Sequence, residues 1–159
     1  MKILLAVDGS EVSLAAVRFA IGMARQGLRS SIVLANVQEP AHLYELVLTT
    51  DAEAIARASA AAGDHILQPA LDMVRQAGLE CECEVAQGDP AHTIVDICER
   101  YGCELIVLGA QGRGVLSGAL LGSVSNQVIH AAGVPVMIVK SEQDIEPDPG
   151  AEIDGDAAA

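Results

Sequence analysis

The stretch of sequence that decides the fold is residues 104–125, ELIVLGAQGRGVLSGALLGSVS. It opens on the apolar run Leu105–Leu108, which is typical of a strand buried on both faces of a parallel sheet. Five glycines follow within residues 109–122, and the hydroxyl residues Ser123 and Ser125 then open a helical pattern. Glycines let backbone N–H groups approach an anion, and a helix N-terminus is electropositive. This order of strand, glycine-rich loop and helix favours a phosphate site over an ordinary surface loop that ends at a serine N-cap.

Strand and helix patterns alternate along the chain up to residue 140, which predicts an α/β fold built on a parallel sheet. Ligands in such sheets bind at the carboxyl ends of the strands, where the strand order reverses. We therefore expect the site residues directly after the strands. The expected strands are Lys2–Val7, Ser31–Val37, Glu80–Ala86, Glu104–Leu108 and Pro135–Val139.

Capping residues mark the helices expected between these strands. Ser10 is a good N-cap, and Asp89–Pro90 places an N-cap directly before a proline at the first helical position. An alanine-rich helical stretch covers about residues 51–77 and contains Pro69. Because proline removes a helical N–H donor, we expect Pro69 to break or kink that helix near Leu67.

Cysteines and histidines outside the glycine-rich stretch are expected to be structural. The four cysteines lack the paired CxxC spacing of a zinc site, and we expect small, buried, reduced side chains at all of them. Cys81 and Cys83 alternate with glutamates in the expected strand Glu80–Ala86, which places that strand at an edge of the sheet or leaves it half covered. His92 and Asp96 lie four residues apart on a helix and are expected to pair on the surface.

Charge and composition limit the classes of function. The 159 residues carry a net charge of −13 and are 51% hydrophobic and 2% aromatic, which predicts one domain with an aliphatic core. Residues 141–159 hold seven acids and no base, so they carry −7 and residues 1–140 carry −6. We expect residues 1–140 to form the domain and residues 141–159 to be a disordered acidic tail rather than an acidic docking peptide. The acidic charge and the scarcity of aromatics argue against nucleic-acid binding.

No segment fits a signal peptide or a membrane helix. The apolar run at the N-terminus is shorter than the roughly 7–15 residues that a signal peptide needs. Residues 114–139 lack charged side chains, but glycines, a proline, serines and amides interrupt them. We therefore expect a soluble, cytoplasmic protein with no membrane partner.

The glycine spacing is specific. Gly109, Gly112 and Gly122–Ser123 fit the pattern G-x2-G-x9-G-(S/T), which resembles the nucleotide-binding signature of the universal stress protein family. Ala110 and Gln111 depart from the family, in which many members have Ser or Thr and then a basic residue, but neither is a signature glycine. Stretches similar to the family occur in order along residues 2–140, namely VDGS at 7–10, GDP at 88–90, ELIVLG at 104–109 and PVMIV at 135–139.

The resemblance implies a single Rossmann-like domain with an open five-stranded parallel sheet, order 3-2-1-4-5, and helices on both faces. It also implies that ATP, ADP or AMP binds between the first and fourth strands, with Mg²⁺ or Mn²⁺ alongside the phosphates. Arg113 is the one side-chain cation close to the glycines in sequence, and we expect it to take part in binding. The binding residues that the resemblance carries over are, from the adenine and ribose to the phosphates, Ala6, Val7, Asp8, Val37, Leu108, Gly109, Gly112, Gly122, Ser123, Val124 and Ser125.

The resemblance further implies a homodimer, formed by antiparallel pairing of the last strand, Val136–Val139, with its copy in a second subunit. We expect an ATP-binding stress-response or signalling module that an unidentified protein partner recognises. No general base is evident near the phosphate residues, so little or no hydrolysis is expected. Two alternatives stay open, a dimeric interaction module that binds no nucleotide and a slow ATPase.

Overall fold

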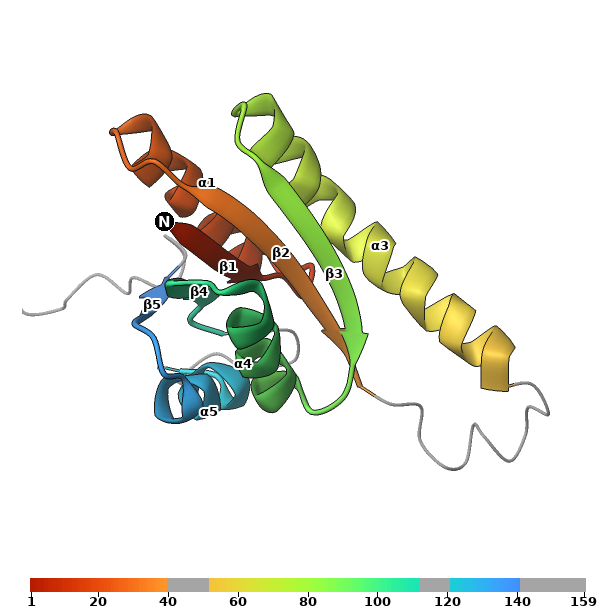
Figure 1. Ribbon diagram of the computed structural model, residues 1–159. Helices are drawn as coiled ribbons and strands as arrows, with labels where there is room; N and C mark the ends of the chain where they lie inside the picture. Colours follow the sequence, from red (N-terminus) through yellow and green to blue (C-terminus); the bar gives the residue numbers. More distant parts are fainter. Residues whose placement is uncertain (40–51, 112–120, 141–159) are drawn as a thin grey trace, which may run out of the picture.

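Five parallel strands form one sheet in the order β3-β2-β1-β4-β5, which confirms the predicted fold (Figure 1). The computed structural model describes residues 1–39, 52–111 and 121–140, so the predicted acidic tail lies outside the described residues. The elements are β1 Lys2–Ala6, α1 Glu11–Arg25, β2 Ser31–Gln38, α3 Ala52–Gln76, β3 Cys81–Gln87, α4 Pro90–Tyr101, β4 Leu105–Gly109, α5 Ser123–Ala131 and β5 Val136–Val139.

The central strand β1 pairs with β2 on one side and with β4 on the other. Leu4, for example, lies between Val33 of β2 and Ile106 of β4. The chain moves outward from β1 to β2 and β3, and then returns to place β4 and β5 on the opposite side. The strand order therefore reverses between β1 and β4, and a crevice is expected at their carboxyl ends.

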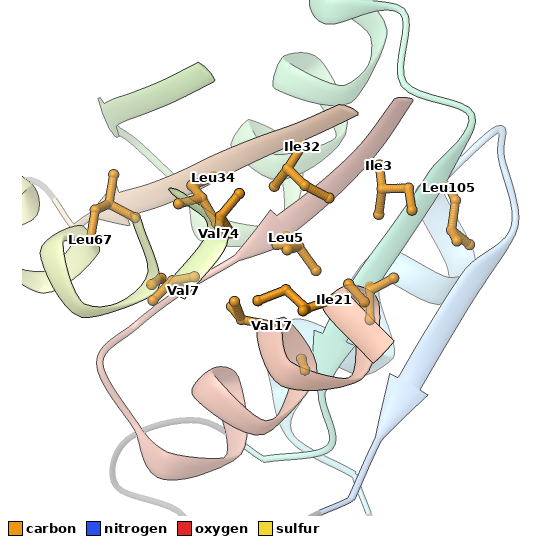
Figure 2. Packing of buried hydrophobic residues seen from close by; sticks show 14 residues of the cluster. Ile3, Leu5, Val7, Val17, Ile21, Ile32, Leu34, Leu67, Val74 and Leu105 are labelled. Atoms are coloured by element: carbon orange, nitrogen blue, oxygen red, sulfur yellow. The ribbon is translucent and has the colours of Figure 1, made fainter. Parts of the chain in front are cut away.

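Two aliphatic cores flank the sheet. Helices α1 and α3 cover one face, where Ile3, Leu5 and Val17 are fully buried (Figure 2). Helices α4 and α5 cover the other face, where Leu4 and Ile97 are fully buried. Each such side chain stabilises the fold by about 1.5–3 kcal/mol relative to leaving it exposed. Alternate residues of β1 serve opposite cores, which explains its uninterrupted apolar sequence.

The capping predictions are confirmed. The Ser10 side chain accepts a hydrogen bond from the N–H of Ser13, and Asp89 accepts one from the N–H of His92 at 3.0 Å. That N–H keeps the pKa of the Asp89 carboxyl below its ordinary value. The predicted pairing of His92 with Asp96 is wrong, because the His92 ring lies 2.7 Å from the Asp89 carboxylate that already caps the helix.

Pro69 does not break its helix, so of the two predicted outcomes, a break or a kink, the break is wrong. Helix α3 continues through it as one element, Ala52–Gln76 (Figure 1). Pro69 is exposed, whereas Leu67 and Ala70 on either side of it are buried against the sheet. The backbone carbonyl that loses its helical donor belongs to the exposed residue His65, and the packed face keeps the helix together.

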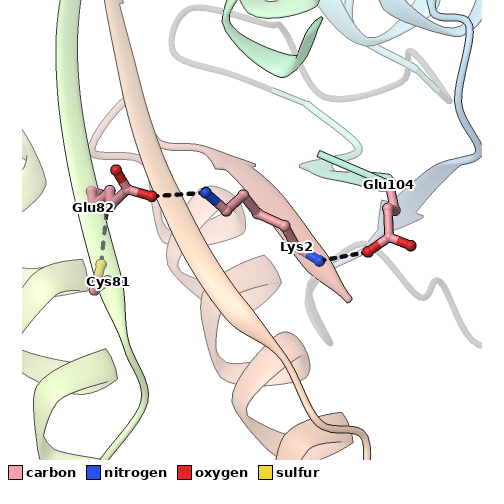
Figure 3. A network of polar contacts seen from close by, with 4 residues as sticks. All are labelled: Lys2, Cys81, Glu82 and Glu104. Atoms are coloured by element: carbon pink, nitrogen blue, oxygen red, sulfur yellow. Dashed lines mark hydrogen bonds and ion pairs between the residues drawn. The ribbon is translucent and has the colours of Figure 1, made fainter. Parts of the chain in front are cut away.

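Strand β3 lies at an edge of the sheet, as predicted. Cys98 and Cys103 are buried as expected, but Cys81 is half-buried and Cys83 is exposed, so the prediction of burial is wrong for Cys83. An edge strand has a neighbour on one side only, and its covering is incomplete. Lys2 at the start of β1 crosses β2 to reach this strand, with its Nζ 2.8 Å from Glu82 (Figure 3).

None of the helices in the described parts of the chain is both long and apolar enough to cross a membrane.

Gly63 of α3 is predicted to be a site where a single added methyl group destabilises the fold. A Cβ there would lie 2.9 Å from Cγ2 of Val85 and 3.0 Å from Oδ1 of Asn36, closer than packed atoms allow. We expect Gly63→Ala to lower the free energy of unfolding by about 1–2 kcal/mol, as overpacking exceeds the gain in helix propensity. Urea denaturation measures the change.

Gly22 of α1 provides the matched control, because nothing lies within 4 Å of a Cβ at that helical position. We expect Gly22→Ala to raise the free energy of unfolding by up to about 1 kcal/mol. Equal effects of the two variants would contradict the packing explanation.

Candidate functional site

A cavity of about 510 Å³ opens at the carboxyl ends of β1, β2 and β4, at the reversal of strand order. Ala6, Val7 and Asp8 enter it from the end of β1, and Leu108 and Gly109 enter it from the end of β4. Residues of the first turn of α5 and of the N-terminal half of α4 also line it, together with Ser13 of α1 and Ile66 of α3. The strand ends therefore meet at one place, as the sheet topology predicts.

Ten of the twelve predicted site residues line this cavity. Gly112 and Arg113 lie outside the described residues, so the structure does not place them. The ten residues are Ala6, Val7, Asp8, Val37, Leu108, Gly109, Gly122, Ser123, Val124 and Ser125.

The N-terminus of α5 presents free backbone donors to the cavity. Gly122 is the N-cap, with φ −70° and ψ 159°, and no side chain of the described chain caps the helix. The first N–H bonded within the helix belongs to Asn126, which donates to the Gly122 carbonyl at 3.0 Å. No described residue accepts from the N–H groups of Ser123, Val124 and Ser125, and all three residues line the cavity. These donors and the helix dipole suit an anion.

This geometry contradicts one alternative considered from the sequence, an ordinary surface loop that ends at a serine N-cap. Ser123 is the first helical residue, and glycine occupies the cap. A serine cap would accept hydrogen bonds from the N–H groups of the first turn. Glycine has no side chain to do so, and the donors stay available.

Gly109 is required by packing against α1. A Cβ at this position would lie 2.8 Å from Cγ1 of Val12 and 3.1 Å from the backbone nitrogen of Ser13. The carbonyl of Gly109 also accepts a hydrogen bond from the hydroxyl of the buried Ser125 at 2.9 Å. The predicted phosphate residues Gly109 and Ser125 therefore join β4, α1 and α5 to one another.

The inner wall of the cavity is aliphatic. Val7, Leu108 and Ile94 are each less than 5% exposed, and Ala6 and Val37 are partly exposed beside them. A flat apolar group can be buried against such a wall, at a gain of roughly 25 cal/mol per Å².

Asn36 is a site residue that the sequence reasoning missed. It is 3% exposed, and its Nδ2 donates to the Val7 carbonyl at 2.7 Å, while its Oδ1 accepts from the amide of Gln38. The bond satisfies the carbonyl of Val7, the residue that follows β1. The feature of the sequence that could have identified it is the side-chain amide of Asn36 itself, which interrupts the apolar run of Ser31–Gln38.

The charged side chains among the described residues that line the cavity are acidic. Asp8 and Glu39 are its two carboxylates, and the described lining residues include no lysine or arginine. The carboxylate of Asp8 accepts a hydrogen bond from the N–H of Ser10 at 2.9 Å, which fixes its position at the end of β1. An anion in this cavity is therefore held by backbone N–H groups and a helix dipole.

The family model for the universal stress protein family matches residues 1–140 of the chain. The chain belongs to the universal stress protein family. Universal stress protein MJ0531 of Methanocaldococcus jannaschii is 32% identical over 139 residues, which cover 87% of this chain and 81% of that protein. The sequence resemblance to the family is thereby confirmed.

Two solved universal stress proteins have the same fold. One, from Archaeoglobus fulgidus and in complex with dAMP, is 26% identical with a TM-score of 0.61, covering 88% of this chain and 98% of that one. The other, in complex with cAMP, is also 26% identical with a TM-score of 0.60, covering 87% of this chain and 95% of that one.

Gly109→Ala tests whether this glycine is needed for packing in the absence of any nucleotide. We expect the substitution to lower the free energy of unfolding by about 1–3 kcal/mol, because backbone atoms of α1 must move away from the new Cβ. Gly133→Ala is the matched control, since nothing lies within 4 Å of a Cβ there. Thermal unfolding of the nucleotide-free protein measures both. An unchanged stability for Gly109→Ala would show that α1 adjusts without cost.

Proposed function

We propose that this universal stress protein binds an adenine nucleotide in the cavity at the carboxyl ends of β1 and β4. The observation that carries the proposal is the uncapped first turn of α5, whose free N–H groups lie beside an aliphatic wall. A nucleotide has matching parts, an anionic phosphate and a flat base. The complexes of two relatives with dAMP and cAMP support the same class of ligand.

The base is proposed to lie against Ala6, Val7 and Val37, where aliphatic groups replace water around its faces, with Leu108 beside the ribose. Asp8 is proposed to accept a hydrogen bond from the ribose or the base. The phosphates would then extend to the residues at the start of α5. The proposed phosphate contacts are Gly109, Gly112, Arg113, Gly122, Ser123, Val124 and Ser125.

We propose ATP as the principal ligand, with Mg²⁺ or Mn²⁺ bound through its phosphates. A triphosphate brings a high negative charge close to Asp8 and Glu39, which are the carboxylates of the described lining. A divalent cation offsets that repulsion, and hard cations of this kind take oxygen ligands. Binding of ATP should therefore depend on the cation more strongly than binding of AMP.

The biological role is proposed to be a nucleotide-dependent stress-response or signalling module that another protein recognises. The groups at the start of α5 are N–H and hydroxyl donors, which hold a phosphate but remove no proton from an attacking water. Little or no hydrolysis is therefore expected. A homodimer is proposed through β5, an edge strand whose four residues are all half-buried.

Calorimetric titration tests the function after any co-purified nucleotide has been removed by unfolding and refolding. We expect binding of AMP, dAMP and ATP, with the affinity for ATP raised by added Mg²⁺. Absence of binding, and of nucleotide in the denatured extract, would leave the dimeric interaction module as the function. Steady release of phosphate from ATP would favour the slow ATPase.

Ser123→Pro is predicted to weaken nucleotide binding without harming α5. Proline removes one N–H donor but is favoured at the first helical position, and Gly122 already has the extended backbone that a residue before proline adopts. A hydrogen bond to a charged group is worth about 1.5–3 kcal/mol, so AMP should bind roughly 10–100-fold more weakly. Binding of adenosine, which lacks the phosphate, should not change.

Ser123→Ala is the matched control, because it removes the hydroxyl and keeps the N–H group. We expect it to weaken AMP binding by less than Ser123→Pro does. Equal losses for AMP and adenosine in Ser123→Pro would contradict the placement of the phosphate at α5.

A further inference from the structure

A second cavity, of about 370 Å³, contains two buried thiols. Cys98 of α4 and Cys103 before β4 line it, together with Gly133 and Val134 after α5. The two cysteines are 2% and 5% exposed in the folded chain. No residue that lines this cavity also lines the first one, so the thiols have no part in the proposed nucleotide site.

The end of α4 brings the two cysteines together. Gly102 has the left-handed conformation, with φ 63°, and the N–H of Cys103 donates to the Cys98 carbonyl at 2.8 Å. This is the Schellman arrangement, in which the side chains of these two positions make contact, usually an apolar one. Here both positions are cysteines, and the Cys98 sulfur lies 3.7 Å from the Cys103 carbonyl oxygen.

The Cys98 thiol thus donates a hydrogen bond to the backbone of Cys103, and each thiol influences the pKa of the other. A disulfide requires a Cα separation of about 4.4–6.8 Å and Cβ atoms that approach each other. The hydrogen bond from the Cys103 N–H to the Cys98 carbonyl closes the backbone into a ring, so the proposed disulfide would join two residues that the fold already holds next to each other.

We propose that Cys98 and Cys103 form a reversible dithiol–disulfide couple, oxidised by a small soluble disulfide of the glutathione type that reaches them through the second cavity. The Cys98 thiolate attacks one sulfur of the soluble disulfide, forms a mixed disulfide and releases one thiol. The Cys103 thiolate then attacks the Cys98 sulfur of the mixed disulfide and releases a second thiol. The two protons end on the released thiols, and the two electrons lost by the cysteines reduce the soluble disulfide.

The order of attack follows from the surroundings of each thiol. Burial raises the pKa of both, that of Cys103 to about 11, while the neighbouring Cys103 side chain acts to lower the pKa of Cys98. The charge of Glu99 also raises the pKa of Cys98. For Cys103, the charge of Lys2 lowers the pKa and that of Glu82 raises it. The thiolate is the reacting form, so oxidation is slow at neutral pH and accelerates about tenfold per pH unit below the pKa.

The other cysteine pair is unsuitable for the same bond. Cys81 and Cys83 lie two residues apart on β3 with their side chains on one face. A strand rises about 3.3 Å per residue, so their Cβ atoms are roughly 6–7 Å apart, beyond the 3.5–4.5 Å of a disulfide.

Peptide mapping of the full chain tests the proposal. The protein is equilibrated with oxidised glutathione, its free thiols are blocked, and it is digested with trypsin. Cleavage after Arg100 separates Cys98, in peptide 76–100, from Cys103, in peptide 101–113. In a Cys81→Ala/Cys83→Ala variant, Cys98 is the only cysteine of the first peptide, so a linked pair of peptides identifies the bond. We expect more than half of the protein to be linked, and the link to disappear with dithiothreitol.

The result that would overturn the proposal is a folded protein in which both peptides stay unlinked, with free or glutathione-modified cysteines. Cys103→Ser removes the second step and should trap glutathione on Cys98. Cys98→Ser should trap less in the same time. If Cys103→Ser keeps its circular dichroism spectrum and traps no glutathione, Cys98 is not the attacking thiol.

Discussion

The backbone of Gly109 and Ala110 holds the candidate site together. Three hydrogen bonds meet there: the Ser125 hydroxyl donates to the Gly109 carbonyl, the Gly122 N–H donates to the Ala110 carbonyl, and the Ala110 N–H donates to the Val139 carbonyl. The first two fix the start of α5 at the end of β4, and the third joins β4 to the end of β5. Glycine at 109 is what allows α1 to pack against this junction. The free N–H groups of α5 can face the cavity because side-chain and backbone bonds on either side of them are already made.

The acidic charge of the chain shapes how an anion must be bound. Residues 1–140 carry −6, and the described lining of the cavity contains carboxylates without a lysine or arginine. Backbone N–H groups and a helix dipole are fixed by the fold and need no flexible side chain to be ordered, so they hold a phosphate at little entropic cost. At long range these groups attract an anion less strongly than a cluster of lysines does. The site therefore selects its ligand by fit at short range, with the aliphatic wall supplying affinity for a base.

Much of the fold followed from local signals in the sequence. Ser10, Asp89 and Gly102 mark helix ends through short-range hydrogen bonds and backbone conformation, so their roles were predictable. The placement of the site residues followed from the rule for parallel sheets. Asn36 was missed because its partner, the Val7 carbonyl, is distant in sequence. The break predicted at Pro69 does not occur, because tertiary packing outweighs the lost helical hydrogen bond. The packing role of Gly109 likewise depends on where α1 lies, which no local pattern gives.

Helix α4 takes part in both cavities, yet the two sites should act independently. Its first turns bring Pro90 and Ile94 to the first cavity, and its last turns bring Cys98 and Glu99 to the second. A rigid helix transmits a displacement from one end to the other. A disulfide between Cys98 and Cys103, however, replaces a contact that the Schellman arrangement already makes, so it moves the helix little. The affinity for an adenine nucleotide should thus be the same in the dithiol and disulfide forms, which makes it a measure of intact folding during oxidation.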